Sequence, residues 1–288
     1  MGERHSNFDA LIHKITPFSE LCTHEKQVYK YTLQAADIYF IIKYITWNLK
    51  ERGLMIIRAI VEFNEEGYMI FAENFPGAFS RGKTRDEALG KLVGEVRQFL
   101  LWSTGMKCSD DCYIEIVQEE KSDACISDAD TTIIFDSEEL PLTFNEYQYT
   151  KSLVIKSAKD FKILYDSIPD VKQTTLPARQ TFYGSIPRTP EEMYMHTNEV
   201  TKSYLDGLAT IENNTDIYLN RIIAFQQIEQ VPNYLDNNVY IHMYGEPWSL
   251  KKAMRRFIWH DRIHAKALYR LAIGLWGSCV VNPFHFIV

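Results

Sequence analysis

The chain has few cysteines and lacks their common pairings. There are five in 288 residues, and no two form a Cys-x-x-Cys pair. So odd and sparse a set is not a disulfide framework of the kind that small secreted domains use, and it favours reduced thiols. Cys108 and Cys112 are separated by three residues without a matching second pair, so we interpret their spacing as incidental rather than as a zinc site.

Long apolar runs are also missing. A bilayer span needs about 18 to 20 apolar residues, and the nearest stretch, 35–49, contains Asp37 and Lys43. Residues 1–25 carry several charged side chains and no sustained apolar core, so a secretory signal is not predicted. We expect a cytoplasmic protein with no membrane partner.

An excess of positive charge is absent as well. The net charge is −7 and the isoelectric point is near 5.7, which leaves no global basic field for binding nucleic acid. The content of 46% hydrophobic and 24% charged residues, with only 13 Gly and 10 Pro, excludes collagen-like and disordered chains. The length favours two domains.

Residues 1–54 are predicted to be an N-terminal extension of unclear role. They are rich in aromatic residues and weakly helical in pattern between Gln27 and Leu49. Met55 follows and opens a β pattern, so we hypothesise that Met55 is the natural start. Peptides from residues before Met55, detected in the native host, would contradict this.

Residues 55–137 are predicted to form a small sheet with one helix on it. β-branched and aromatic runs predict strands, and the short loop 64–67, which ends in Gly, predicts a hairpin. Thr84 and Glu87 have the spacing of a capping box and predict the start of the helix. The expected strands are 55–63, 68–73, 78–81, 113–117 and 131–135.

This stretch resembles the HicB-like antitoxin domain. The resemblance rests on the hairpin with Glu65-Glu66-Gly67-Tyr68, the segment Phe75-Pro-Gly-Ala-Phe-Ser-Arg-Gly82, and Thr84-x-Asp-Glu-Ala88 at the helix start. It implies a partial RNase H-like fold that binds a toxin partner. Asp86 and Glu87 are interpreted as first-turn helix charges rather than as nuclease carboxylates.

Residues 138–288 are predicted to be all-α. Helix starts are indicated by capping patterns at Thr143 and Thr189, by Thr215 and by Pro247-Trp248-Ser249, with ends near Ile168, Ala209, Gln230 and Leu275. The β-branched run 152–155 leaves a strand open as an alternative for part of the first helix. Four helices with short connections favour an up-and-down four-helix bundle, so the fold class is α+β.

Three histidines stand out in this half. His260 and His264 are four residues apart, which places both imidazoles on one helix face, on or beside an apolar stripe. His196 falls in the predicted buried stripe of the second helix, with Met193 and Tyr204. Burying unpaired polar groups costs about 1 to 3 kcal/mol each, and a shared metal offsets that cost. We interpret the three as a metal site with an open coordination position.

The helical half resembles the DinB-like superfamily, in which a bundle carries one early His on its second helix and a His pair on its last. The resemblance implies that His196, His260 and His264 bind a divalent ion such as Zn or Ni. It also implies activities such as thiol transfer from low-molecular-weight thiols. Glu199 and Asp261 are candidates for orienting ligands or moving protons, with surface or capping roles as the alternative.

Two functions follow from these patterns. The first is a metal-dependent hydrolase or thiol transferase that acts on a small electrophile, in which the HicB-like module mediates homodimerisation or regulation. The second is a non-enzymatic, antitoxin-like protein that binds a toxin partner. Nucleic-acid processing is the least favoured, because neither an acidic cluster nor a basic surface is predicted.

Overall fold

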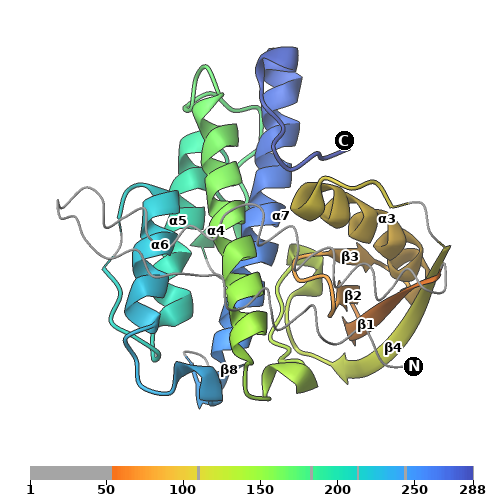
Figure 1. Ribbon diagram of the computed structural model, residues 1–288. Helices are drawn as coiled ribbons and strands as arrows, with labels where there is room; N and C mark the ends of the chain where they lie inside the picture. The colour runs from red at the N-terminus through yellow and green to blue at the C-terminus, as the bar shows by residue number, and fades with distance from the viewer. Residues whose placement is uncertain (1–53, 109–110, 182–183, 213, 243–244, 288) are drawn as a thin grey trace, which may run out of the picture. The chain divides into compact units, whose positions relative to one another are not determined.

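The computed structural model describes residues 54–108, 111–181, 184–212, 214–242 and 245–287. All of them belong to the unit Tyr39–Val288. In this part the chain is mixed α+β, with a four-stranded sheet followed by helices, which confirms the predicted class at that level (Figure 1). Among the described helices, none combines the length and apolarity needed to cross a membrane. The predicted extension 1–54, except for its last residue, lies outside this description.

The sheet has the strand order β3-β2-β1-β4. Its strands are β1 (Leu54–Asn64), β2 (Gly67–Ala72), β3 (Phe79–Gly82) and β4 (Asp111–Lys121). β1 and β2 are antiparallel and pair up to Asn64 and Gly67, so the predicted hairpin is confirmed. β4 returns beside β1 in parallel orientation. β4 is therefore an edge strand of the sheet.

The helix α3 (Arg85–Thr104) begins where the capping pattern predicts. The Thr84 hydroxyl accepts a hydrogen bond from the Glu87 amide, while the Glu87 carboxylate accepts one from the amide of Lys83 rather than of Thr84. The helix ends at Gly105, whose φ of 72° is left-handed. Its buried face, which includes Leu92, packs against the sheet.

The strand predicted at 131–135 is wrong. This segment has no regular structure and lies between two 3₁₀ turns, Ile126–Asp128 and Asp136–Glu138. Its carbonyls accept hydrogen bonds from side chains instead of a neighbouring strand. The donors are Arg256 to Thr131, Lys252 to Thr132, Arg255 to Ile133 and Gln118 to Ile134. Three of these donors lie on α7 and the fourth, Gln118, lies on β4.

Four helices follow, at the places the capping patterns indicate. They are α4 (Phe144–Asp166), α5 (Pro190–Leu205), α6 (Ile217–Ile228) and α7 (Leu250–Trp276). The run 152–155 is helical within α4, so the strand alternative is wrong. Pro247 and Trp248 form the strand β8 against β7 (Tyr240–Ile241), and Ser249 caps α7. A second small hairpin, β5 (Gln180–Thr181) with β6 (Gly184–Ser185), was not predicted.

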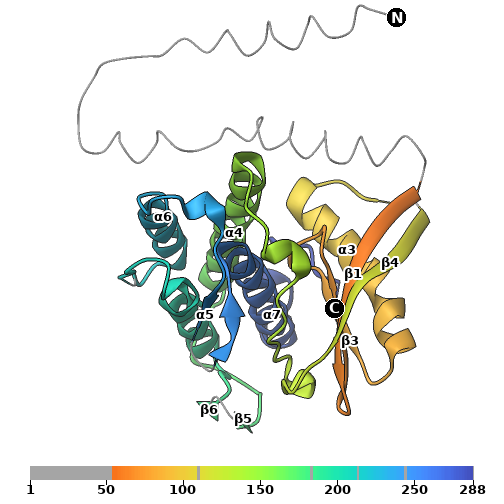
Figure 2. The ribbon, with the colours of Figure 1, turned by 90° about the horizontal axis from the view of Figure 1, so that it is seen from below.

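The long helix α7 lies between the sheet with α3 and the other helices, as both views show (Figures 1 and 2). One continuous set of buried side chains runs from Ile57 on the sheet through Phe257 on α7 to Phe225 on α6. Whether the chain divides into domains near residue 137 stays a prediction. α7 is the element that carries two of the three selected histidines.

Candidate metal centre

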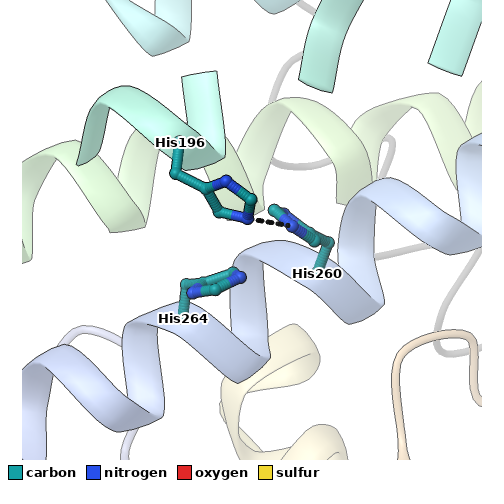
Figure 3. Close-up of side chains that lie close together, drawn as sticks. All are labelled: His196, His260 and His264. Carbon is teal, nitrogen blue, oxygen red and sulfur yellow. Dashed lines mark hydrogen bonds between the residues drawn. The ribbon is translucent and has the colours of Figure 1, made fainter. Parts of the chain in front are cut away.

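Three histidines from two helices meet beside α7 (Figure 3). His196 comes from α5, and His260 and His264 from α7. The Nε2 atoms of His260 and His196 are 3.2 Å apart. One ring nitrogen from each of the three lies within 4.8 Å of the other two. The predicted trio is therefore brought together in space.

Local sequence places these side chains. Thr189 and Glu192 form a reciprocal capping box, and Pro190 opens α5, so His196 lies in its second turn. On α7, a spacing of four residues brings the rings of His260 and His264 to 4.4 Å between centroids. The helix starts thus fix the register in which α5 presents one ring to the α7 pair.

Burial differs among the three in a way the sequence pattern did not predict. His260 is buried, with 8% of its surface exposed, whereas His264 is partly buried and His196 is the most exposed. The buried stripe of α5 contains Met193 and Tyr204 as predicted, but runs through Thr197 and Thr201 rather than His196. His196 therefore lies at the rim of the cluster.

All three imidazoles are held in the neutral form. Burial lowers the pKa of His264 to about 3. Burial, together with the two neighbouring imidazoles, lowers the pKa of His260 well below its usual value. Burial also lowers the pKa of His196, against the opposing effect of Glu199. Because a histidine binds a metal through an unprotonated nitrogen, the cluster is ready to coordinate at neutral pH.

One of the three spacings between ring nitrogens matches the spacing expected around a single ion. Two nitrogens of a tetrahedral zinc site, each about 2.0 to 2.1 Å from the metal, are about 3.3 Å apart. The observed 3.2 Å between His196 and His260 is close to that edge. The same distance fits a hydrogen bond in which one neutral ring donates to the other. The buried Nδ1 of His260 has no hydrogen-bond partner.

Asp261 has neither of the alternative roles considered from the sequence, a surface role or a capping role. Its side chain is fully buried and pairs with the equally buried Arg221 of α6 at 2.9 Å. The Ser157 hydroxyl of α4 donates to its second oxygen at 2.6 Å. Arg221 also donates to the Thr201 hydroxyl at 2.8 Å. Asp261 thus ties three helices to α7 directly after His260, and its oxygens are already engaged.

The remaining candidates are Glu199 and, as pocket-lining residues, Tyr194, Tyr204 and Tyr244. Glu199 is exposed on α5, one turn after His196. Tyr204 is buried and packs edge-on against His260, with 5.8 Å between ring centroids. The Tyr194 hydroxyl accepts a hydrogen bond from the amide of Ile217, and the Tyr194 ring stacks on the ring of Tyr165. Tyr194 therefore has a packing role. Tyr244 lies outside the described residues.

The other histidines within the described residues lie outside the cluster. His242 lies 2.8 Å from the Ser203 carbonyl oxygen and packs against Trp248. His285 is exposed near the C-terminus. His5, His13 and His24 fall outside the described residues.

Arg221 is the residue that the sequence interpretation missed. Its guanidinium is fully buried and lies 3.8 Å from the centroid of the Phe257 ring. The available signal was the pair Asn220-Arg221 within the otherwise apolar start of α6, because a charged residue in an apolar stripe needs a partner. The sequence contained Asp261 but did not show which residue faces it.

A scan against protein-family models, a search of curated proteins and a search of solved structures found no match for this chain.

Proposed function

We propose that the chain is a divalent-metal-dependent enzyme acting on a small electrophile, either as a hydrolase or as a transferase of a low-molecular-weight thiol. The observation that carries this is the convergence of three neutral imidazoles with ring nitrogens within 4.8 Å. His196, His260 and His264 are the proposed ligands, and Zn or Ni the proposed ion. Three nitrogen ligands leave a position open for water or substrate.

The residues around the cluster have distinct parts in this proposal. An ion bound by three imidazoles lowers the pKa of bound water or of a bound thiol. Burial keeps the imidazoles unprotonated, and Tyr204 limits the tilt of the His260 ring. Glu199 is the candidate to accept or return a proton, because its charge acts on His196. Asp261 acts as a positioning residue, since Arg221 and Ser157 occupy its oxygens.

The proposal also covers the family. We propose that α4 to α7 form a DinB-like four-helix bundle, and that the sheet with α3 is a HicB-like module. In support, α4 packs on α6 and α7, and α5 on α6 and α7. The Phe-Pro-Gly turn that carries the HicB resemblance packs on the bundle: the Gly77 carbonyl accepts from Arg262 Nε at 3.2 Å.

The proposed role of the sheet module is association into a homodimer. β4 is an edge strand, and its Tyr113 is 57% exposed beside the exposed Ile56 of β1. Unpaired strand edges with apolar neighbours favour pairing with a second chain. Sedimentation equilibrium of the wild type and Tyr113→Lys tests this: a dimer that the substitution disrupts supports it, and a monomeric wild type contradicts it.

The test of the enzymatic proposal is metal-dependent turnover. Metal-free protein and protein loaded with Zn or Ni are assayed with activated esters, and with alkylating electrophiles in the presence of low-molecular-weight thiols. We expect turnover only in the loaded wild type, and loss of it in His260→Ala/His264→Ala.

His285→Asn is the matched control, since it removes an exposed histidine at a left-handed position that Asn tolerates (φ 56°). Turnover that survives both metal removal and the double substitution would contradict the proposal. A loaded site without turnover on any substrate would favour the antitoxin-like alternative.

A further inference from the structure

Two sulfur side chains are in contact at the start of the sheet, and a third lies on the neighbouring strand, all on different elements from the histidine cluster. Cys108, just after α3, places its Sγ atom 4.0 Å from the Sδ atom of Met55 in β1. Met55 is buried, with 4% of its surface exposed, so its thioether is held in place by the core. A buried thioether in contact with a thiol is one half of a soft-metal ligand set.

The second thiol comes from the neighbouring strand. Cys112 in β4 is the pairing partner of Met55 in β1, and the two strands are parallel. Paired residues on adjacent strands share a face of the sheet and are about 4.8 Å apart along the hydrogen-bonding direction. The flanking Asp111 and Tyr113 are exposed, whereas Cys112 packs against the same core cluster as Cys108. All three sulfur side chains therefore belong to one face and one end of the strand pair.

We propose that Cys108, Cys112 and Met55 form a binding site for a soft monovalent metal ion, Cu(I). In a trigonal site with metal–sulfur bonds of about 2.3 Å, neighbouring sulfur atoms are about 4.0 Å apart. The observed distance between Cys108 and Met55 is 4.0 Å. Thiolate and thioether ligands together select Cu(I) over harder divalent ions. Zinc binds nitrogen, oxygen and thiolate ligands in both its closed structural sites and its open catalytic sites, so the thioether of Met55 favours Cu(I) over zinc here.

The site is accessible and needs no redox step. Cys108 and Cys112 are both thiols and partly buried, so an ion reaches them from solvent. Binding of one Cu(I) replaces the protons of the two thiols, which are released to solvent, while Met55 contributes a lone pair. Cu(I) is supplied already reduced, as occurs in thiol-buffered surroundings.

The experiment is an anaerobic titration of the reduced, full-length protein with Cu(I) in competition with a chromophoric Cu(I) chelator. It is carried out in the His260→Ala/His264→Ala background, so that the histidine cluster does not contribute. We expect a single tight equivalent. We expect Met55→Leu, Cys108→Ser and Cys112→Ser each to weaken Cu(I) affinity by more than about tenfold. Losing even a residue that only supports a metal ligand costs about that much, and these three are ligands themselves.

Cys125→Ser and Cys279→Ser are the matched controls, because these cysteines lie elsewhere and should leave the affinity unchanged. X-ray absorption at the copper edge of the unsubstituted site gives a readout that does not depend on whether a variant folds. Three sulfur ligands are expected. Nitrogen ligation, or tight binding that survives Cys108→Ser/Cys112→Ser, would overturn the proposal.

Discussion

At the scale of single residues, burial rather than residue type decides what each polar group does. His260 and Asp261 are adjacent on α7, yet one faces His196 and the other faces Arg221 and Ser157. The sequence spacing identified the histidine trio, since four residues on a helix define a face. It did not identify the role of Asp261, because its partners come from α4 and α6, far away in the sequence.

The Asp261 pair yields a stability prediction. Replacing Asp261 with Asn leaves the fully buried Arg221 charge uncompensated, which costs about 3 to 5 kcal/mol. The matched control is Asp166→Asn, whose pair with Lys162 on α4 is exposed and contributes less than about 1 kcal/mol. Urea unfolding measures both. Equal losses in the two variants would refute the structural role assigned to Asp261.

The pKa of His264 gives a pH dependence. Folding lowers this pKa from 6.5 to about 3, so between those values the unfolded chain binds more protons than the folded one. The stability that His264 contributes is therefore present above pH 6.5 and lost as the pH falls towards about 3. We expect chemical unfolding across this range to show that metal-free wild type loses more stability on acidification than metal-free His264→Gln. A difference that is constant with pH would contradict a neutral, buried His264.

At the scale of elements, local capping signals predicted where helices begin better than where they end. Thr84, Thr143, Thr189 and Ser249 all cap helices, because a hydroxyl followed by free amides is a purely local arrangement. The predicted ends at Ala209 and Gln230 were too late, since α5 ends at Leu205 and α6 at Ile228. The segment 131–135 shows the limit most clearly: three of its side-chain hydrogen-bond donors lie on α7 and one on β4, and nothing local indicates the α7 donors.

Substitutions at two glycines test the close contact between the turn at Gly77 and α7. Gly77 has a φ of 96°, and a Cβ there would lie 2.5 Å from the Cγ2 atom of Ile258 on α7. We expect Gly77→Ala to cost at least about 1 to 2 kcal/mol, since left-handed backbone alone costs that much. Gly94, within α3, has open space around it, so Gly94→Ala should stabilise by up to about 1 kcal/mol. Thermal unfolding measures both, and shifts of the same sign would contradict the close contact between this turn and α7.

At the scale of the whole described part, α7 joins the sheet to the other helices through cations as well as apolar groups. Lys266 pairs with Glu95 of α3 at 2.7 Å, and Arg255 pairs with the buried Glu138. The Arg255 guanidinium also lies 3.9 Å from the centroid of the Phe135 ring. The sequence predicted an apolar α7 stripe correctly at Met254 and Phe257. It did not show that the opposite face is buried too, against a neighbouring module.

This shared core predicts cooperative unfolding. Because buried contacts run without interruption from β1 to α7, the two parts should unfold together. Native-state hydrogen exchange should give the same opening free energy for amides at the centres of β1 and α7. A markedly lower value for one of them would show that the two parts unfold independently.

The metal content of the purified protein shows whether the three histidines hold a divalent ion. Tag-free protein, purified without added metal, is measured by inductively coupled plasma mass spectrometry beside His260→Ala/His264→Ala and His285→Asn. We expect near-stoichiometric Zn or Ni in the wild type and in His285→Asn, and loss of it in the double variant. Absence of metal from the wild type even after reconstitution with Zn and Ni would contradict the account and leave the 3.2 Å contact between His196 and His260 as a plain hydrogen bond.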